Sequence, residues 1–263
     1  MGWDSVLTGC GAAAEAVLIL LMLRVRLFRT FPAFMLWVCS SFVIDSYYLF
    51  AVTYQKIQPS LNLYEIQIAV DSILMFAVLV ELAWSVLRPI RSSLPKYSWL
   101  AIVGVILVAG AIVWFVAGLA VPGNLTPDGN IFFRLQQTGA ILRVVVFLAM
   151  ASLSQLLSIG WRNRELQIAT GFGFYSIVSL AVTVMHTHQA PGSAQYHLLD
   201  EAGSASYLLA LAYWVFAFAT REAERREFTP QMQSFLLAAA GSARTARIGL
   251  ANSSAAKPRK TDE

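Results

Sequence analysis

The sequence predicts an all-α fold, a polytopic membrane bundle of seven transmembrane helices with the N-terminus outside and the C-terminus cytoplasmic. Of its 263 residues, 57% are hydrophobic and only 13% are charged, whereas soluble domains average about 25% charged residues. The Lys and Arg residues lie in short connections between apolar stretches and in the tail. A net charge of +4 therefore indicates orientation in a lipid bilayer, and we expect no nucleic-acid partner.

Seven apolar stretches are each close to the roughly 20 residues that cross a hydrocarbon core. They are residues 6–23, 31–52, 63–87, 99–121, 131–159, 166–185 and 196–218. No Lys or Arg precedes Arg24, so the charged region of a cleavable signal peptide is missing and we expect the first stretch to be a retained helix. The connections are short, which predicts one transmembrane domain over residues 1–220.

The orientation follows from the basic residues in alternate connections. The connections after the first, third, fifth and seventh stretches hold Arg24, Arg26, Arg29, Arg88, Arg91, Lys96, Arg162, Arg164, Arg221, Arg225 and Arg226. The other side holds Lys56, with Arg134 just inside the fifth stretch. Because cytoplasmic loops are enriched in Lys and Arg, this asymmetry predicts the orientation given above.

Residues 221–263 read as a cytoplasmic basic tail. Thr229-Pro230 is typical of a helix start, with the threonine as N-cap and the proline at the first helical position. A short amphipathic helix on the inner leaflet would follow, a solvated tail being the alternative, and the end from about residue 251 is expected to be disordered. A protein partner would dock here.

The first three stretches and the last three share one topology. Each set has a basic hairpin between its first two members, Arg24-Val25-Arg26 and Arg162-Asn163-Arg164. This would make stretch 99–121 the linker of a 3+1+3 arrangement of parallel repeats. Chance similarity of apolar helices is the alternative.

Four segments resemble a group of uncharacterised bacterial seven-helix integral membrane proteins of unknown function. They are Arg29-Thr30-Phe31-Pro32, Val70-Asp71-Ser72-Ile73-Leu74, Tyr196-His197-Leu198-Leu199-Asp200-Glu201 and Glu227-Phe228-Thr229-Pro230. The resemblance implies a seven-helix protein of the bacterial inner membrane and implies nothing about activity.

Carboxylates inside the apolar stretches point to a polar interior. A charged side chain facing lipid costs ~2.5–3.5 kcal/mol or more, so such residues normally face other helices or water. Glu15, Asp45 and Asp71 lie at similar depths in the first three stretches, and Arg143 lies deep in the fifth. We expect these groups to pair and to border an outward-opening cavity built by the first, second, third, fifth and seventh helices.

Helical spacing places polar residues on shared faces. Ser41, Asp45 and Tyr48 share a face of the second helix, Tyr64, Gln67 and Asp71 of the third, Gln136 and Arg143 of the fifth, Ser176, Ser179, Thr183 and His186 of the sixth, and Asp200, Ser204 and Tyr207 of the seventh. The ligand-binding residues predicted from this pattern are Glu15, Asp45, Tyr48, Gln67, Asp71, Gln136, Arg143, Asp200, Ser204 and Tyr207. Interhelical hydrogen bonds and one buried ion pair would be the structural alternative.

Two further features are interpreted as structural. Glu81 lies near the cytoplasmic end of its stretch, where Trp84 and Arg88 are the expected partners. Gly171-Phe172-Gly173 indicates close helix packing.

The three histidines lie close together in sequence. His186 and His188 end the sixth stretch, and His197 and Glu201 begin the seventh at i, i+4 spacing, which would let them hold a divalent metal such as zinc at the outer rim. Ordinary interfacial histidines are the alternative, because the spacing matches no established metal signature.

The leading functional hypothesis is therefore binding of a small solute or ion in the cavity, for transport or sensing. A metal-dependent membrane enzyme using His186, His197 and Glu201 is the second hypothesis, and a non-enzymatic structural or signalling subunit acting through its tail is the third. A retinal chromophore is excluded, because the lysines are Lys56, Lys96, Lys257 and Lys260, and none lies in an apolar stretch.

Overall fold

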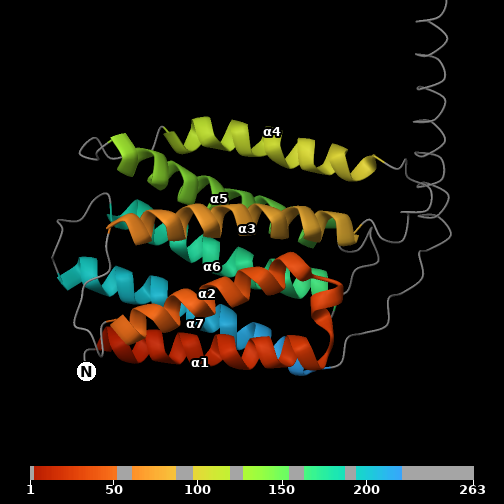
Figure 1. Cartoon of the computed structure of the whole chain (residues 1–263). Coiled ribbons are helices and arrows are strands. Elements are labelled where there is room, and N and C mark those ends of the chain that lie inside the picture. Colours follow the sequence, from red (N-terminus) through yellow and green to blue (C-terminus); the bar gives the residue numbers. More distant parts are fainter. Residues whose placement is uncertain are drawn as a thin grey trace, which may run out of the picture.

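The computed structural model describes residues 3–51, 61–86, 97–118, 127–153, 163–186 and 194–220. Its elements are α1 (Trp3–Arg24), the 3-10 turn η1 (Leu27–Arg29), α2 (Pro32–Phe50), α3 (Leu61–Val86), α4 (Ser98–Gly118), α5 (Pro127–Leu153), α6 (Arg164–His186) and α7 (Ala194–Ala219). The helices lie side by side and alternate in direction (Figure 1). The predicted basic tail lies outside the described residues.

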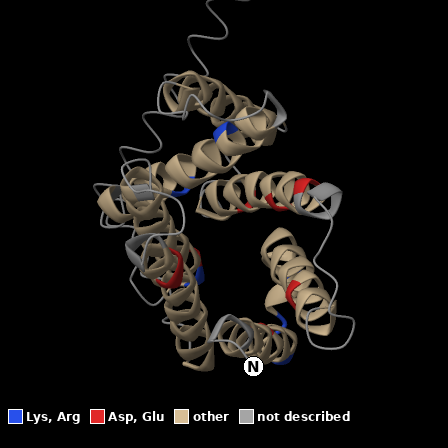
Figure 2. Cartoon of the chain, turned by 90° about the vertical axis from the view of Figure 1, so that its left-hand side faces the viewer, with Lys and Arg blue, Asp and Glu red and all other residues tan. Residues whose placement is uncertain are grey.

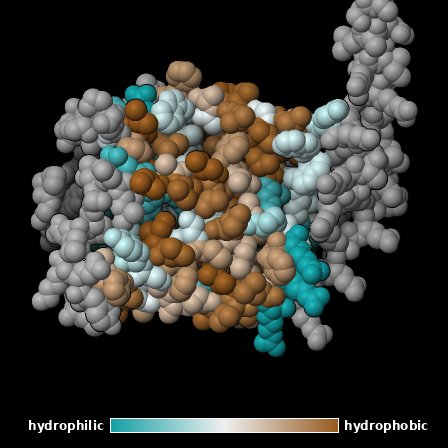
Figure 3. Space-filling view, viewed as in Figure 1, coloured by the Kyte–Doolittle hydropathy of each residue, from teal (hydrophilic) through white to brown (hydrophobic). Residues whose placement is uncertain are grey.

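The described residues form an all-helical structure in which seven helices are long and apolar enough to span a membrane. Large apolar side chains are exposed on the outside of the bundle, among them Leu20, Val43, Ile73, Phe115 and Phe216. Figure 3 shows apolar surface across the middle of one face. A soluble protein rarely exposes apolar patches of this extent, so these surfaces are compatible with contact to lipid.

The observed helix ends differ from the predicted stretches mainly in α5. The prediction began at Ile131, but the helix begins at Pro127. Proline suits the first turn of a helix because it has no amide hydrogen to leave unpaired. The polar residues Asp128 and Asn130 hide this first turn from a reading based on hydrophobicity.

The helices α1, α2, α3, α5, α6 and α7 form a closed ring, each packed against the next and α7 packed against α1. Within the described residues, α4 packs against α3 and α5 and lies outside the ring (Figure 2). The order of contacts is therefore 3+1+3, with α1–α3 and α5–α7 as the two halves. Whether the two halves are parallel repeats stays a prediction, because the contacts between helices do not test it.

The core occupies one half of the bundle. We call the end at which α1, α3, α5 and α7 begin the N-terminal end, which lies at the left of Figure 1, and the other the opposite end. The buried apolar cluster lies toward the opposite end and includes Leu18, Met22, Phe34, Trp37, Val78, Leu82, Leu166, Phe172, Leu211, Trp214 and Phe218. Its aromatic rings meet edge to face, with Trp37 4.9 Å from Phe172 and 5.9 Å from Trp214 between centroids.

Gly171 and Gly173 on α6 permit this close packing. A Cβ at Gly171 would overlap the Trp214 indole, and one at Gly173 would overlap the Phe147 ring. The predicted role of this segment in helix packing is confirmed.

Glu81 caps a neighbouring helix, a structural contact as expected, but with backbone amides of α2 that the sequence did not indicate. Its Oε1 accepts the Ala33 N–H at 2.9 Å and its Oε2 accepts the Phe34 N–H at 3.0 Å. The N-cap residue of α2, Phe31, provides no side-chain acceptor. Glu81 on α3 therefore satisfies first-turn amides of α2, at the end where the helix dipole favours a negative charge. Arg88 lies outside the described residues.

Arg164 plays the reciprocal role at the end of α7. Its guanidinium donates to the carbonyls of Ala217 at 2.6 Å and Thr220 at 2.8 Å. A cation at a helix C-terminus satisfies free carbonyls and complements the dipole. In each half of the ring, a charge on one helix thus caps a neighbour at the opposite end of the bundle.

Candidate functional site

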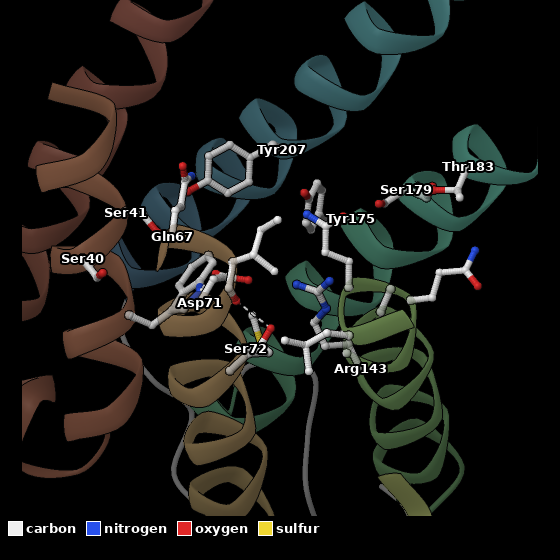
Figure 4. A pocket seen from close by; sticks show the side chains of 18 of the residues that line it. Ser40, Ser41, Gln67, Asp71, Ser72, Arg143, Tyr175, Ser179, Thr183 and Tyr207 are labelled. Carbon is white, nitrogen blue, oxygen red and sulfur yellow. Dashed lines mark hydrogen bonds between the residues drawn. The ribbon is translucent and has the colours of Figure 1, made fainter. Parts of the chain in front are cut away.

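A cavity of about 350 Å³ lies where the packed core ends. At ~30 Å³ per water molecule it has room for roughly ten waters. Its polar and charged lining comes from α2, α3, α5, α6 and α7 and includes Ser40, Ser41, Asp45, Gln67, Asp71, Ser72, Gln136, Gln137, Arg143, Tyr175, Ser179, Thr183 and Tyr207. Figure 4 shows side chains from these helices pointing into one space. We call it the central cavity.

Arg143 is the buried cation of the central cavity. The residue is only 8% exposed, and its guanidinium carbon lies 5.4 Å from the centre of the Tyr175 ring, close enough for a cation–π contact. Its Nε is buried and has no hydrogen-bond partner among the described residues. The expected ion pair between Arg143 and a cavity carboxylate is not formed in the described part of the chain.

Asp71 is engaged by an aromatic side chain. The Trp37 indole Nε1 donates to its Oδ1 at 2.7 Å. This bond ties α3 to α2 at the floor of the cavity, because Trp37 also packs in the aromatic core. This neutral donor satisfies one of the two carboxylate oxygens of Asp71.

Asp45 lies half-buried one helix away and receives no hydrogen bond from the described residues. Near the same helix end, the Tyr48 hydroxyl donates to Gln67 Oε1 at 2.9 Å and links α2 to α3. Gln67 lines the cavity, and Tyr48, which does not line it, holds the Gln67 side chain.

Glu15 lies away from the cavity wall, contrary to expectation. It is 0% exposed and accepts a hydrogen bond of 2.5 Å from the Tyr207 hydroxyl, which joins α1 to α7. Its helix turns this face toward α7, so Glu15 positions Tyr207, and Tyr207 faces the cavity.

A second cavity, of about 620 Å³, adjoins the first. It is lined by α1, α2, α6 and α7 and includes the predicted residues Asp200 and Ser204 together with Thr8, His197 and Glu201. Asp45, Tyr175 and Tyr207 line both cavities. We call this second space the acidic vestibule, because Asp45, Asp200 and Glu201 all border it.

The structure thus divides the predicted binding residues between two spaces. Asp45, Gln67, Asp71, Gln136, Arg143 and Tyr207 border the central cavity, Asp200 and Ser204 border the vestibule, and Glu15 and Tyr48 support neighbours. The helices that build the central cavity also differ from the predicted ones. α6 contributes to its wall, whereas α1 borders only the vestibule. The stripe of Ser179 and Thr183 signalled α6, but nothing in the sequence singled out Tyr175.

The metal hypothesis receives no support from the described residues, which hold no group of three His, Cys, Asp or Glu side chains placed to bind a metal. His197 and Glu201 are exposed on α7. His188 lies outside the described residues, and the side chain of His186 is not described.

The chain matches no protein-family model, no protein of curated function and no solved structure.

Proposed function

We propose that the protein is an integral membrane protein that binds a small solute with an anionic group in the central cavity, for transport or sensing. The proposal rests on the position of Arg143, which is buried and lines the central cavity. A buried guanidinium is costly without a counter-ion. Arg143 has none among the described residues, and it borders a space large enough for a solute. A bound carboxylate or similar anion would supply the missing partner through charge-assisted hydrogen bonds.

The surrounding residues suit a polar ligand. Ser41, Gln136, Ser179 and Thr183 offer hydroxyl and amide groups to orient it, while Trp37 and Met75 provide apolar contact. Such a mixture of apolar wall and few convergent polar groups is typical of small-molecule sites.

The proposed orientation places the central cavity toward the outside. Arg24, Arg26 and Arg29 are exposed at the opposite end of the bundle, and basic residues collect on the cytoplasmic side. The cavity lies toward the N-terminal end, above the packed core. A solute would therefore enter from outside, and the aromatic floor would separate it from the cytoplasm.

The test is a screen for thermal stabilisation of the purified protein in lipid nanodiscs by small carboxylates, phosphate, sulfate and nitrate. We expect at least one anion to raise the melting temperature of the wild-type protein. The variant Arg143→Gln should lose that shift, because a neutral amide cannot replace the guanidinium charge.

Arg134→Gln is the matched control. Arg134 also lies on α5, but its Nε donates to Asn130 at 2.9 Å and it does not line the central cavity. This variant should keep the ligand-induced shift. The absence of any stabilising anion, or a shift that survives Arg143→Gln, would overturn the proposal.

A further inference from the structure

Charges of both signs border the central cavity: the described residues supply Arg143, Asp45 and Asp71. Arg143 borders it from α5 and Asp45 borders it from α2, yet the described residues form no ion pair between them. In a water-poor interior, opposite charges attract strongly. Two opposite charges that line one cavity without pairing are each available to a ligand that carries both charges.

Asp71, the second carboxylate of the cavity, already accepts one hydrogen bond. Asp71 accepts the Trp37 indole N–H at 2.7 Å, whereas Asp45 receives no hydrogen bond from the described residues. Asp45 is therefore the carboxylate better placed to receive a donor from a ligand.

The carboxylates of the acidic vestibule make the distribution of charge around the central cavity asymmetric. Asp45 belongs to both spaces, and Asp200 and Glu201 border the vestibule without lining the central cavity. Negative potential thus extends outward from the Asp45 side, while the buried cation lies on α5. A field of this form attracts the cationic end of a solute to Asp45 and its anionic end to Arg143.

We infer that the ligand is a small zwitterion with a carboxylate and an ammonium group, the chemistry of a free amino acid. This inference rests on the proposed function. The carboxylate of the ligand pairs with Arg143, and its ammonium group donates to Asp45. Tyr175 and Tyr207, which line both spaces, stand beside Asp45 at the boundary. The volume of about 350 Å³ is large enough for a solute of this size.

The experiment compares matched probes on the full-length protein in nanodiscs, with dissociation constants measured by calorimetry. The probes are glycine, L-alanine, L-serine and L-glutamine, each with the acid that lacks its amino group and the amine that lacks its carboxyl group. We expect at least one amino acid to bind about tenfold or more tightly than both of its analogues, because each analogue leaves one cavity charge unpartnered.

Variants assign the two ends of the ligand. Asp45→Asn should weaken the amino acid about tenfold or more and leave the affinity of the amino-free acid nearly unchanged. Arg143→Gln should weaken both. Glu201→Gln, in the vestibule but outside the central cavity, should change the affinity much less than Asp45→Asn.

The outcomes separate this inference from the proposed function. If the amino-free acids bind as tightly as the amino acids, or no amino acid in the panel binds while another anion does, the zwitterion inference is overturned and anion binding at Arg143 stands. If neither amino acids nor any anion bind, both are overturned. The probe comparison uses wild-type protein, so it remains decisive even where a variant fails to fold.

Discussion

Charged residues inside this bundle fall into two classes at the scale of single side chains. Glu81 and Arg164 form hydrogen bonds with backbone groups at the ends of neighbouring helices, and these bonds stabilise their charges. Arg143 and Asp45 face a cavity and lack such partners among the described residues. The sequence marks all four as charges within or beside apolar stretches, but only their surroundings separate structural from functional groups.

Removal of the α2 cap should reduce stability. Glu81→Ala leaves the first-turn amides of Ala33 and Phe34 without their acceptor, and we expect a loss of about 1–3 kcal/mol in the free energy of unfolding. SDS-driven unfolding in mixed micelles measures it. Glu65→Ala, at the other end of the same helix, is the control, and an equal loss in both variants would contradict the capping role.

At the scale of helices, small residues decide how closely the ring can close. α6 approaches α7 through Gly171, where the Trp214 indole occupies the space that a side chain would need. Trp214 Nε1 also donates to the Gln167 carbonyl at 3.2 Å, which ties the two helices together. This contact supports the aromatic floor of the central cavity from below.

A methyl group at this helix crossing should therefore destabilise the fold. We expect Gly171→Ala to lower the free energy of unfolding by about 1–3 kcal/mol through overpacking. Gly104→Ala, on the outer helix α4, meets no atom within 4 Å and should be neutral or stabilising by up to about 1 kcal/mol, since alanine favours helix. The same SDS titration compares them, and a neutral Gly171→Ala would refute the tight crossing.

At the scale of the molecule, the bundle is solid toward one end and hollow toward the other. Core residues such as Phe172 and Phe218 fill the opposite end, while the two cavities occupy the half toward the N-terminal end. Because the exposed arginines of the α1–α2 connection mark the packed end, the proposed orientation opens the hollow end to the outside.

Thiol labelling of intact cells tests this arrangement. In a background with Cys10→Ala and Cys39→Ala, Ser41→Cys places a thiol in the cavity wall, and we expect it to react with a membrane-impermeant charged maleimide. Ser85→Cys replaces a buried residue that donates to Glu165 at 2.8 Å near the packed end, and it should stay unlabelled. Labelling of position 85 without position 41 would indicate that the packed end faces the outside and would contradict the proposed orientation.

By itself, the sequence determined the seven long apolar helices of the described residues, because the length and apolarity of a stretch are local properties. It also indicated which helix faces are polar, since the helical period places Asp71 on the same face as Gln67, and Arg143 on the same face as Gln136. Only the tertiary structure decided which of those faces meet. It turned Glu15 toward Tyr207, brought α6 and Tyr175 into the cavity wall, set α4 outside the ring and left Arg143 without an ion pair to any described residue. These outcomes depend on the rotation of each helix against its neighbours, and packing across the whole bundle settles that rotation.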